Sequence, residues 1–227
     1  MKLTVIIPVY NEASTIGEVI RRVRSVAGPG MEIEIVAVDD ASTDGTHAIL
    51  DSLDGVTILR HPVNKGKGAA IRTGLSAATG EAVIIQDADL EYEPADYRSI
   101  LRPMEEGRAD VVYGSRIMGG NRHSYLRFYY GGRMLTSMFN LLYSTRLTDL
   151  TTCYKAFRRE TIASLDLRCE RFEFCPEVTA RLALKGVTIL EVPIAYRPRS
   201  IEEGKKIRWH DGVQAMWTML SLRIGHR

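Results

Sequence analysis

Residues 82–91 read AVIIQDADLE, an apolar run that ends in two aspartates separated by one residue. Consecutive apolar residues of this kind predict a strand buried on both faces, as in a parallel sheet covered by helices. In such sheets, ligands bind at the carboxyl ends of the strands. Asp87 and Asp89 follow this strand directly, so we expect both carboxylates at the ligand-binding edge of an α/β sheet.

The first 115 residues alternate between predicted strands and predicted helices. The predicted strands are 3–9, 32–38, 56–59, 82–86 and 111–114, and the predicted helices are 16–26, 46–53, 68–78 and 94–106. Strands that alternate with helices of this length indicate βαβ units. The fold class predicted is therefore α/β, with a mainly parallel central sheet flanked by helices on both faces.

The pattern changes after residue 116. A stretch rich in Gly, Arg and Tyr predicts a mobile loop over 119–130, and 204–208 predicts a basic loop. The remaining elements expected are helices at 132–143, 176–185 and 209–223 and strands at 153–157 and 187–192. No repeat or low-complexity linker divides the sequence, so we expect a single domain over residues 1–227.

The composition is that of an ordinary folded protein. The 227 residues are 45% hydrophobic and 26% charged, which excludes disordered, collagen-like and disulfide-scaffold proteins. The three cysteines include no CxxC pair, so they are expected to be packing residues in a reducing compartment, and none of the five histidines is assigned a role. No signal peptide and no run of about 18 apolar residues is present, so we expect a cytoplasmic chain that does not span a membrane by itself.

The two halves of the sequence carry opposite charges. Residues 1–115 contain 11 Lys and Arg against 18 Asp and Glu, a net charge of −7. Residues 116–227 contain 19 against 10, a net charge of +9. This division is typical of a protein that binds a cation in one part and anionic groups in the other, although two solvated surfaces of opposite sign would give the same counts.

Carboxylates also follow the second predicted strand. A turn and a helix start explain Ser42 and Asp44 as capping residues. Capping does not explain Asp40, which is placed to accept hydrogen bonds from the N–H edge of a base, with Asp39 as the alternative.

Two carboxylates such as Asp87 and Asp89 offer a hard divalent cation oxygen ligands and leave room for water and a diphosphate, and Glu91 is a candidate third ligand.

Residues 64–68, NKGKG, open the third predicted helix. The N–H groups of a helix start and two lysines, Lys65 and Lys67, favour a nearby anion, whereas a glycine turn with solvated lysines is the alternative. No GxxxxGK[ST] motif occurs, and the third glycine of a dinucleotide fingerprint is missing at Ile71. P-loop enzymes and dinucleotide dehydrogenases are therefore disfavoured.

Taken together, these motifs resemble the family 2 inverting glycosyltransferases, whose fold is the GT-A type of nucleotide-diphospho-sugar transferases. The matching stretches are 5–12 VIIPVYNE, 38–45 VDDASTDG, 64–68 NKGKG, 87–89 DAD and 114–116 GSR. Within that family, the chain is most similar to the dolichyl- or polyprenyl-phosphate mannosyltransferase and glucosyltransferase group. That similarity extends through 149–155 DLTTCYK, 171–177 RFEFCPE and 204–207 GKKI.

The resemblance implies a set of site residues. The first half, 1–115, would bind nucleotide and metal, and the second, 116–227, would bind the acceptor. Asp87 and Asp89 would hold Mg²⁺ or Mn²⁺, and a glutamine often stands at the position of Glu91. The nucleotide sugar would be bound by Pro8, Tyr10, Glu12, Val38, Asp40, Lys67, Asp87, Ala88, Asp89, Arg116, Arg199, Lys206 and Arg208. The residues implied in catalysis are Asp89, Arg116 and Arg127, of which Arg127 would approach the acceptor phosphate.

The activity implied is a metal-dependent, inverting transfer of a hexose from a nucleotide diphosphate sugar, of the GDP-mannose or UDP-glucose type, to polyprenyl or dolichyl phosphate. A lipid phosphate is already ionised, so it needs cations to position it rather than a strong base. A sugar hydroxyl as acceptor would need a base. Asp149 and Glu177 are the candidates for that role, with helix capping or ion pairing as their alternative.

Three other functions stay open. They are a family 2 enzyme with a saccharide or other soluble acceptor, a nucleotidyltransferase, and a silent nucleotide-sugar-binding module. The nucleotidyltransferase is disfavoured because residues 8–12 stand where such enzymes carry a glycine-rich loop. No nucleic-acid partner is expected.

Apolar residues at helical spacing occur at 134–142 and at 209–222. Each set either faces the core or lies on the cytoplasmic face of a membrane, where the enzyme would be peripherally associated. A separate membrane subunit is the alternative way to reach a lipid acceptor.

Overall fold

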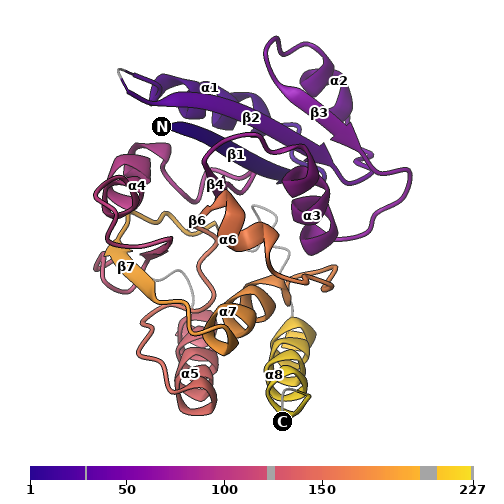
Figure 1. Cartoon of the computed structure of the whole chain (residues 1–227). Coiled ribbons are helices and arrows are strands. Elements are labelled where there is room, and N and C mark those ends of the chain that lie inside the picture. The colour runs from indigo at the N-terminus through magenta and orange to yellow at the C-terminus, as the bar shows by residue number, and fades with distance from the viewer. Residues whose placement is uncertain (29, 122–125, 200–208, 226–227) are drawn as a thin grey trace.

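The computed structural model of the chain describes residues 1–28, 30–121, 126–199 and 209–225 (Figure 1). The first half contains β1 (Lys2–Val9), α1 (Ile16–Ser25), β2 (Glu32–Asp39), α2 (Thr46–Asp51), β3 (Thr57–Arg60), α3 (Lys67–Ala77), β4 (Ala82–Ile85), the 3₁₀ turn η1 (Pro94–Asp96), α4 (Tyr97–Glu105) and β5 (Val111–Ser115). The second half contains α5 (Leu126–Tyr143), β6 (Lys155–Arg158), α6 (Arg159–Ala163), α7 (Phe174–Leu184), β7 (Ile189–Pro193) and α8 (Trp209–Ile224).

The strands form one seven-stranded sheet in the order β3-β2-β1-β4-β6-β5-β7. β6 runs antiparallel to both of its neighbours, and the other neighbouring strands are parallel to each other. The prediction of a mainly parallel α/β sheet is confirmed. Since β6 comes from the second half of the chain and lies between β4 and β5, both halves build the same sheet.

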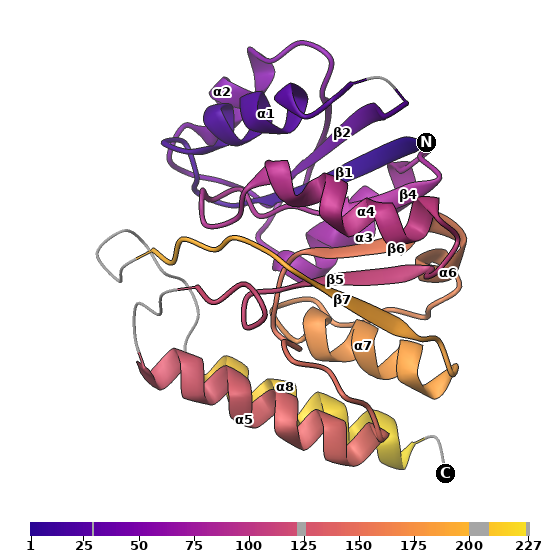
Figure 2. The same cartoon turned by 90° about the vertical axis from the view of Figure 1, so that its left-hand side faces the viewer.

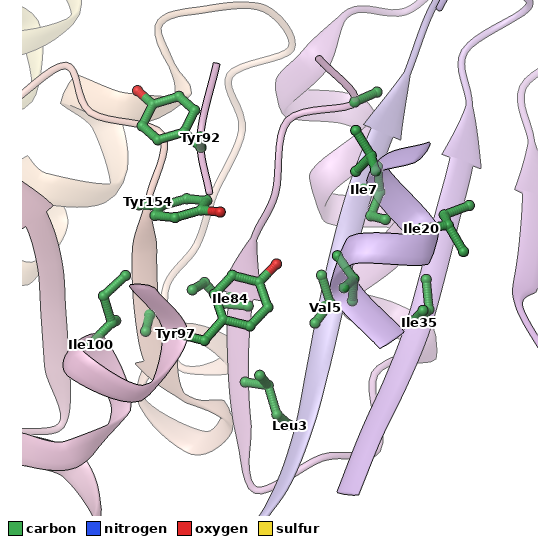
Figure 3. Packing of buried hydrophobic residues seen from close by; sticks show 14 of the residues in the cluster. Leu3, Val5, Ile7, Ile20, Ile35, Ile84, Tyr92, Tyr97, Ile100 and Tyr154 are labelled. Atoms are coloured by element: carbon green, nitrogen blue, oxygen red, sulfur yellow. The ribbon is translucent and has the colours of Figure 1, made fainter. Parts of the chain in front are cut away.

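Helices cover both faces of the sheet (Figure 2). On one face, α1 and α4 pack against the alternate residues of β1, including Leu3, Val5 and Ile7, in the largest apolar cluster (Figure 3). On the other face, α3, α6 and α7 pack against residues of β1, β4 and β5. α5 and α8 lie side by side beyond α7 and share a third cluster with it.

Helix α3 packs unusually closely on β1. A Cβ added at Gly74 would lie 2.5 Å from the Ile6 Cγ2 atom, which is closer than real side-chain contacts allow. The small residues of α3 therefore let the helix backbone approach the sheet. This approach places the start of α3 next to the carboxyl ends of β1 and β2.

Two expectations for the second half are wrong. α5 begins at Leu126 rather than at Gly132, so part of the predicted loop 119–130 is helical, and Gly131 and Gly132 do not interrupt the helix. The short helix α6 was not predicted because its five residues are too few to show a helical period. Within the described ranges, no helix is both long and apolar enough to cross a membrane.

Glu34 on β2 ties two neighbouring segments together. Its carboxylate accepts hydrogen bonds from the Thr4 hydroxyl and from both the backbone N–H (2.9 Å) and the hydroxyl (2.5 Å) of Thr79. Burial opposes its ionisation, but these hydrogen bonds outweigh burial and lower the pKa of Glu34 to about 2. A carboxyl whose pKa is lowered on folding stabilises the protein above its unfolded pKa and loses that contribution as the pH falls through the folded pKa.

We therefore expect Glu34→Gln to lower the free energy of unfolding at pH 7 by about 1.5–3 kcal/mol, the range for hydrogen bonds to charged groups. The difference from the wild type should shrink as the pH falls from about 5 to about 2. Urea denaturation across this pH range measures the difference in the free energy of unfolding between the two proteins. Glu32→Gln is the matched control, because Glu32 lies on the same strand with its side chain 73% exposed. A difference that does not change with pH would contradict this account.

Candidate active site

The functional side chains gather where the parallel strands end. Because these strands run in the same direction, their carboxyl ends meet at one edge of the sheet, the edge away from the N-terminus in Figure 2. The side chains at this edge follow β1, β2, β4, β5 and β7 in turn, and they are Glu12, Asp40, Asp87, Asp89, Arg116 and Arg199. The predicted location of Asp87 and Asp89 is confirmed by the position of β4 in the sheet.

Arg199 joins two of the predicted acidic residues. Its guanidinium donates to Glu12 (Nη1–Oε2 3.1 Å, Nη2–Oε1 3.0 Å) and to Asp89 (Nη2–Oδ2 2.9 Å). The side chains of Glu12 and Asp89 are 8% and 14% exposed. Arg199 therefore compensates two buried negative charges that lie 187 and 110 residues away in the chain.

Lys67 pairs with the other aspartate of the DAD motif. Its ammonium group donates to Asp87 Oδ1 and, at 3.0 Å, to the Cys153 Sγ atom. Lys67 comes from the first turn of α3, so the close packing of that helix delivers the cation to the sheet edge. The predicted anion-facing lysine thus lies in the site, next to a metal-ligand candidate.

The two aspartates differ in their affinity for a proton. Burial opposes the ionisation of Asp87, but the charge of Lys67, the hydrogen bonds from Lys67 and Cys153 and the charge of Arg199 together outweigh burial, so the pKa of Asp87 is lowered. Burial, together with the charges of Asp87 and Glu91, raises the pKa of Asp89 to about 7, even though Arg199 opposes the shift. The site therefore concentrates more negative charge than Lys67 and Arg199 neutralise.

The expectation that Glu91 is a third metal ligand is not supported by its geometry. One carboxylate oxygen accepts the Arg199 backbone N–H at 2.7 Å, and the other accepts the Tyr196 hydroxyl at 2.8 Å. The Glu91 backbone carbonyl also accepts the Arg197 N–H at 2.8 Å. Glu91 thus attaches the segment that carries Arg199 to the DAD motif.

Arg116 follows β5 and is held by Asp149. The two side chains form a bidentate pair, with Nε–Oδ2 and Nη2–Oδ1 both at 2.8 Å, and Nη2 also donates to Thr151 Oγ1. The guanidinium carbon lies 5.1 Å from the centre of the Tyr196 ring. Two of the three nitrogens of Arg116 thus bind protein groups, and its implied contact with the nucleotide sugar stays a prediction.

Asp40 is directed at the segment before α3. Its Oδ1 atom accepts the Lys65 N–H at 2.9 Å and lies 2.6 Å from His61 Nδ1, and its Oδ2 atom accepts the Gly66 N–H at 2.7 Å. These contacts use three of the roughly four acceptor positions of a carboxylate. The contact to a base that the sequence suggests stays a prediction, and it would use the remaining position on Oδ2.

The glycines of NKGKG are explained by packing. Gly66 has φ +96°, and a Cβ there would lie 2.6 Å from the Glu170 carbonyl oxygen. A Cβ at Gly68 would lie 2.5 Å from the Cys169 carbonyl oxygen. Since the Glu170 carbonyl also accepts the Ala69 N–H at 2.9 Å, part of the helix start binds the protein itself rather than an anion.

The other predicted residues fall into three groups. Pro8 and Tyr10 lie at the end of β1, and Tyr10 is 38% exposed. Val38 and Ala88 are buried among core side chains, so a ligand would meet their backbone rather than their side chains. Arg127 lies in the first turn of α5, but its side chain, like Lys206 and Arg208, lies outside the described residues.

Several supporting residues were not predicted from the sequence. Gln86 Oε1 accepts the hydroxyls of Tyr97 and Tyr154, both at 2.7 Å, and its Nε2 donates to the Asp87 carbonyl. His61 Nε2 lies 2.9 Å from Thr73 Oγ1, which links Asp40 to α3. A single polar residue at the end of an otherwise apolar run was the only sequence signal for Gln86.

The two candidate bases are already engaged. Asp149 binds Arg116, as above, and is 3% exposed. Glu177, 1% exposed, accepts the backbone N–H groups of Arg168 (2.9 Å) and Cys169 (2.8 Å) and pairs with Arg181. The ion-pairing alternative is therefore confirmed for both residues.

The donor set of the DAD motif fits a hard divalent cation. Asp87 and Asp89 present carboxylate oxygens at this edge, where burial and the neighbouring negative charges of Asp87 and Glu91 raise the pKa of Asp89. No cluster of three or more metal-ligating side chains occurs among the described residues. Mg²⁺ is commonly held by one or two carboxylates, with waters and substrate phosphates as the other ligands, so the two carboxylates of the DAD motif are of the kind and number that such an ion uses.

Solved structures resemble this fold over nearly its whole length. Glucosyl-3-phosphoglycerate synthase from Mycobacterium tuberculosis, solved with Mn²⁺, UDP and phosphoglyceric acid, superposes with a TM-score of 0.75 at 20% identity, covering 98% of this chain and 78% of that one. The same enzyme with Mg²⁺ and UDP gives a TM-score of 0.75 at 21% identity, covering 99% and 79%. These similarities confirm the predicted GT-A fold.

Curated relatives match most of the chain. Dolichol-phosphate mannosyltransferase of Pyrococcus furiosus is 28% identical over 212 residues, which are 90% of this chain and 59% of that protein. Undecaprenyl-phosphate mannosyltransferase of Micrococcus luteus is 29% identical over 252 residues, covering 99% and 100%. Polyprenol monophosphomannose synthase of Mycolicibacterium smegmatis is 30% identical over 217 residues, covering 88% and 79%.

The family model described as glycosyl transferase family 2 matches residues 4–165, which include β1 to β6 and both aspartates of the DAD motif. With the sheet arranged as the motifs predicted and this match covering most of the sequence, the chain belongs to glycosyl transferase family 2.

Proposed function

We propose that this family 2 glycosyltransferase moves a hexose from a nucleoside diphosphate sugar to the phosphate of a polyprenyl or dolichyl lipid, with inversion at the sugar. The observation that carries the proposal is the pairing of Asp87 and Asp89 with two cations, Lys67 and Arg199, at the carboxyl edge of the sheet. The names of the curated relatives support a hexose and a lipid-phosphate acceptor, and the structural neighbour solved with UDP supports a nucleoside diphosphate donor.

The chemistry needs positive charge more than it needs a base. An oxygen of the acceptor phosphate attacks the anomeric carbon, the bond from that carbon to the diphosphate oxygen breaks, and the nucleoside diphosphate leaves with the electron pair. No proton is transferred, because the acceptor is already ionised. Asp149 and Glu177, the carboxylates considered as bases, are both committed to ion pairs, which favours a phosphate over a hydroxyl acceptor.

Each charged group at the edge has a role in this proposal. Asp87 and Asp89 would hold Mg²⁺ or Mn²⁺, which, when bound, stabilises the negative charge that develops on the leaving diphosphate. Lys67 and Arg199 supply fixed positive charge beside the same two carboxylates. Asp149 orients Arg116, and Glu91 holds the segment that carries Arg199.

A soluble phosphorylated acceptor is the second candidate. The structural neighbour named glucosyl-3-phosphoglycerate synthase was solved with phosphoglyceric acid, a phosphate-bearing acceptor in water. The same cations would position either phosphate. Incubation with labelled donor and each acceptor distinguishes the two: label in the organic phase supports the lipid, and label only in the aqueous phase supports the soluble acceptor.

For a lipid acceptor, the enzyme would work peripherally at the cytoplasmic face of a membrane, as the sequence suggested. A separate membrane subunit would be an alternative means of recruitment. GDP-mannose and UDP-glucose are the two donors to compare, because the Asp40 carboxylate would accept an N–H from the base of either donor.

Removal of one carboxylate from the DAD motif should slow transfer strongly without unfolding the protein. We expect Asp89→Asn to lower kcat by about 10²-fold or more, since charge stabilisation of the leaving group is lost. Initial rates with both donors, together with a melting curve, measure the effect. Asp54→Asn, at an exposed carboxylate far from this edge, is the matched control. Transfer at the wild-type rate by Asp89→Asn would disprove the role assigned to this residue.

Nucleotide binding should depend on a divalent cation. We expect UDP or GDP to raise the melting temperature in the presence of Mn²⁺, because a ligand that binds only the folded state stabilises it. After removal of the metal with a chelator, the shift should largely disappear. Even with Mn²⁺ present, Asp87→Asn should show only the small rise in melting temperature that the wild type shows without metal. Asp54→Asn should behave as the wild type does. An equal shift with and without metal would refute metal-dependent donor binding.

A further inference from the structure

Two helices of the second half, α5 and α8, expose several large apolar side chains. On α8, Val213, Trp217, Leu220 and Ile224 are exposed, and Trp217 is 71% exposed. Their spacing of three and four residues places them on one side of the helix. On α5, the exposed apolar side chains are Leu126, Tyr130, Met134 and Leu141, of which Leu141 is 83% exposed.

These exposed side chains are not the ones that fill the core. On α5, Phe139 and Tyr143 are buried in the cluster shared with α7 and α8, and on α8 Met219 is buried there. The apolar faces expected at 134–142 and 209–222 therefore divide into an inner side and an outer side. α5 and α8 lie side by side below α7 (Figure 1), and the outer side of each helix is the one that does not face the cluster they share with α7.

The helices on the opposite face of the sheet differ in this respect. The exposed residues of α1 are Arg21, Arg24 and Ser25, and those of α4 are Arg98, Ser99, Arg102 and Glu105. An apolar outer side is thus confined, among these helices, to α5 and α8. Contiguous exposed apolar side chains of this kind mark a surface that binds a partner or a membrane.

The charges around this surface favour an anionic partner. Arg133, Arg146 and Arg223 are exposed on or beside the two helices. α5 contains no Asp or Glu, and the one acidic residue of α8, Asp211, is half-buried. Apolar side chains including a Trp, flanked by arginines, are the combination that binds at the headgroup level of an anionic bilayer.

The surface also has a definite position relative to the site. α5 starts ten residues after Arg116, and α8 starts ten residues after Arg199, so both helices begin on the side of the molecule where the strands end (Figure 2). We propose that the outer side of α5 and α8 docks on an anionic lipid bilayer and holds the candidate active site at its surface. This inference rests on the proposed function, because a lipid-linked phosphate would be presented at the same surface.

The test is flotation of the full chain with vesicles of phosphatidylcholine and phosphatidylglycerol. The wild type should float with these vesicles and much less with phosphatidylcholine alone. We expect the double variant Leu141→Ser, Trp217→Ser to bind at least about tenfold more weakly, because both side chains lie on the outer side. Val63→Ser, which removes a 61% exposed apolar side chain from the segment between β3 and α3, should float as the wild type does.

A charge variant gives an independent measurement. Arg133→Gln should weaken binding to the phosphatidylglycerol vesicles by about fivefold, the effect of one basic residue near an anionic surface. Arg98→Gln on α4 is its matched control. Melting curves of all variants should match that of the wild type, since the substituted side chains are exposed.

Several outcomes would overturn the inference. The first is that the double variant floats as well as the wild type does. The second is that the wild type floats with neither kind of vesicle, a result that would point to recruitment by a membrane subunit. A dimer that the double variant abolishes would assign the surface to a second copy of the chain instead.

The proposed function is checked separately with a short-chain, water-soluble polyprenyl phosphate. The double variant should use this acceptor at the wild-type rate, but should show a higher apparent KM for long-chain acceptor in vesicles. No transfer to the short acceptor by any form of the protein would refute the proposed function, while the flotation result would still decide the docking surface.

Discussion

Repulsion between three carboxylates at one edge of the sheet is the constraint that the rest of the site satisfies. Glu12, Asp87 and Asp89 are brought together because β1 and β4 are adjacent and parallel. Their side chains are largely buried, and burial of like charges without compensation is strongly unfavourable. Lys67 and Arg199 provide the compensation, so the start of α3 and the segment after β7 must both reach this edge.

The requirement for Arg199 explains why a glutamate stands at position 91. A carboxylate has two acceptor oxygens, and Glu91 uses one for the Arg199 N–H and the other for the Tyr196 hydroxyl. A glutamine has one acceptor oxygen and would present a donor group to the second partner. The place of Glu91 two residues after the DAD motif suggested a third metal ligand, whereas its contacts show a residue that positions the arginine beside Asp87 and Asp89.

What the sequence could predict depended on how far apart along the chain the interacting residues are. The strands and helices of the first half were predicted because the period of apolar residues is a local property, and the edge position of Asp87 and Asp89 followed from the strand before them. The contacts of Asp40 with Lys65 and of Glu91 with Arg199 span 25 and 108 residues, so no local pattern reports them. On α5, periodicity identified apolar positions but could not show that Phe139 faces inward and Leu141 faces outward.

The positive charge of the second half lies in two kinds of environment, one buried and one exposed. Part of the positive charge of the second half is buried in ion pairs. Arg116 pairs with Asp149 of the same half, whereas Arg199 pairs with Glu12 and Asp89 and so joins the second half to the acidic edge of the first. Another part is exposed on or beside α5 and α8, where Arg133, Arg146 and Arg223 have no paired carboxylate among the described contacts. Charges of the first kind are shielded from salt by the protein, whereas those of the second kind are screened within about 10 Å at 0.1 M salt. Ionic strength should consequently act on docking at a bilayer and leave the ion pairs of the site intact, which makes the two uses of the same net charge separable by experiment.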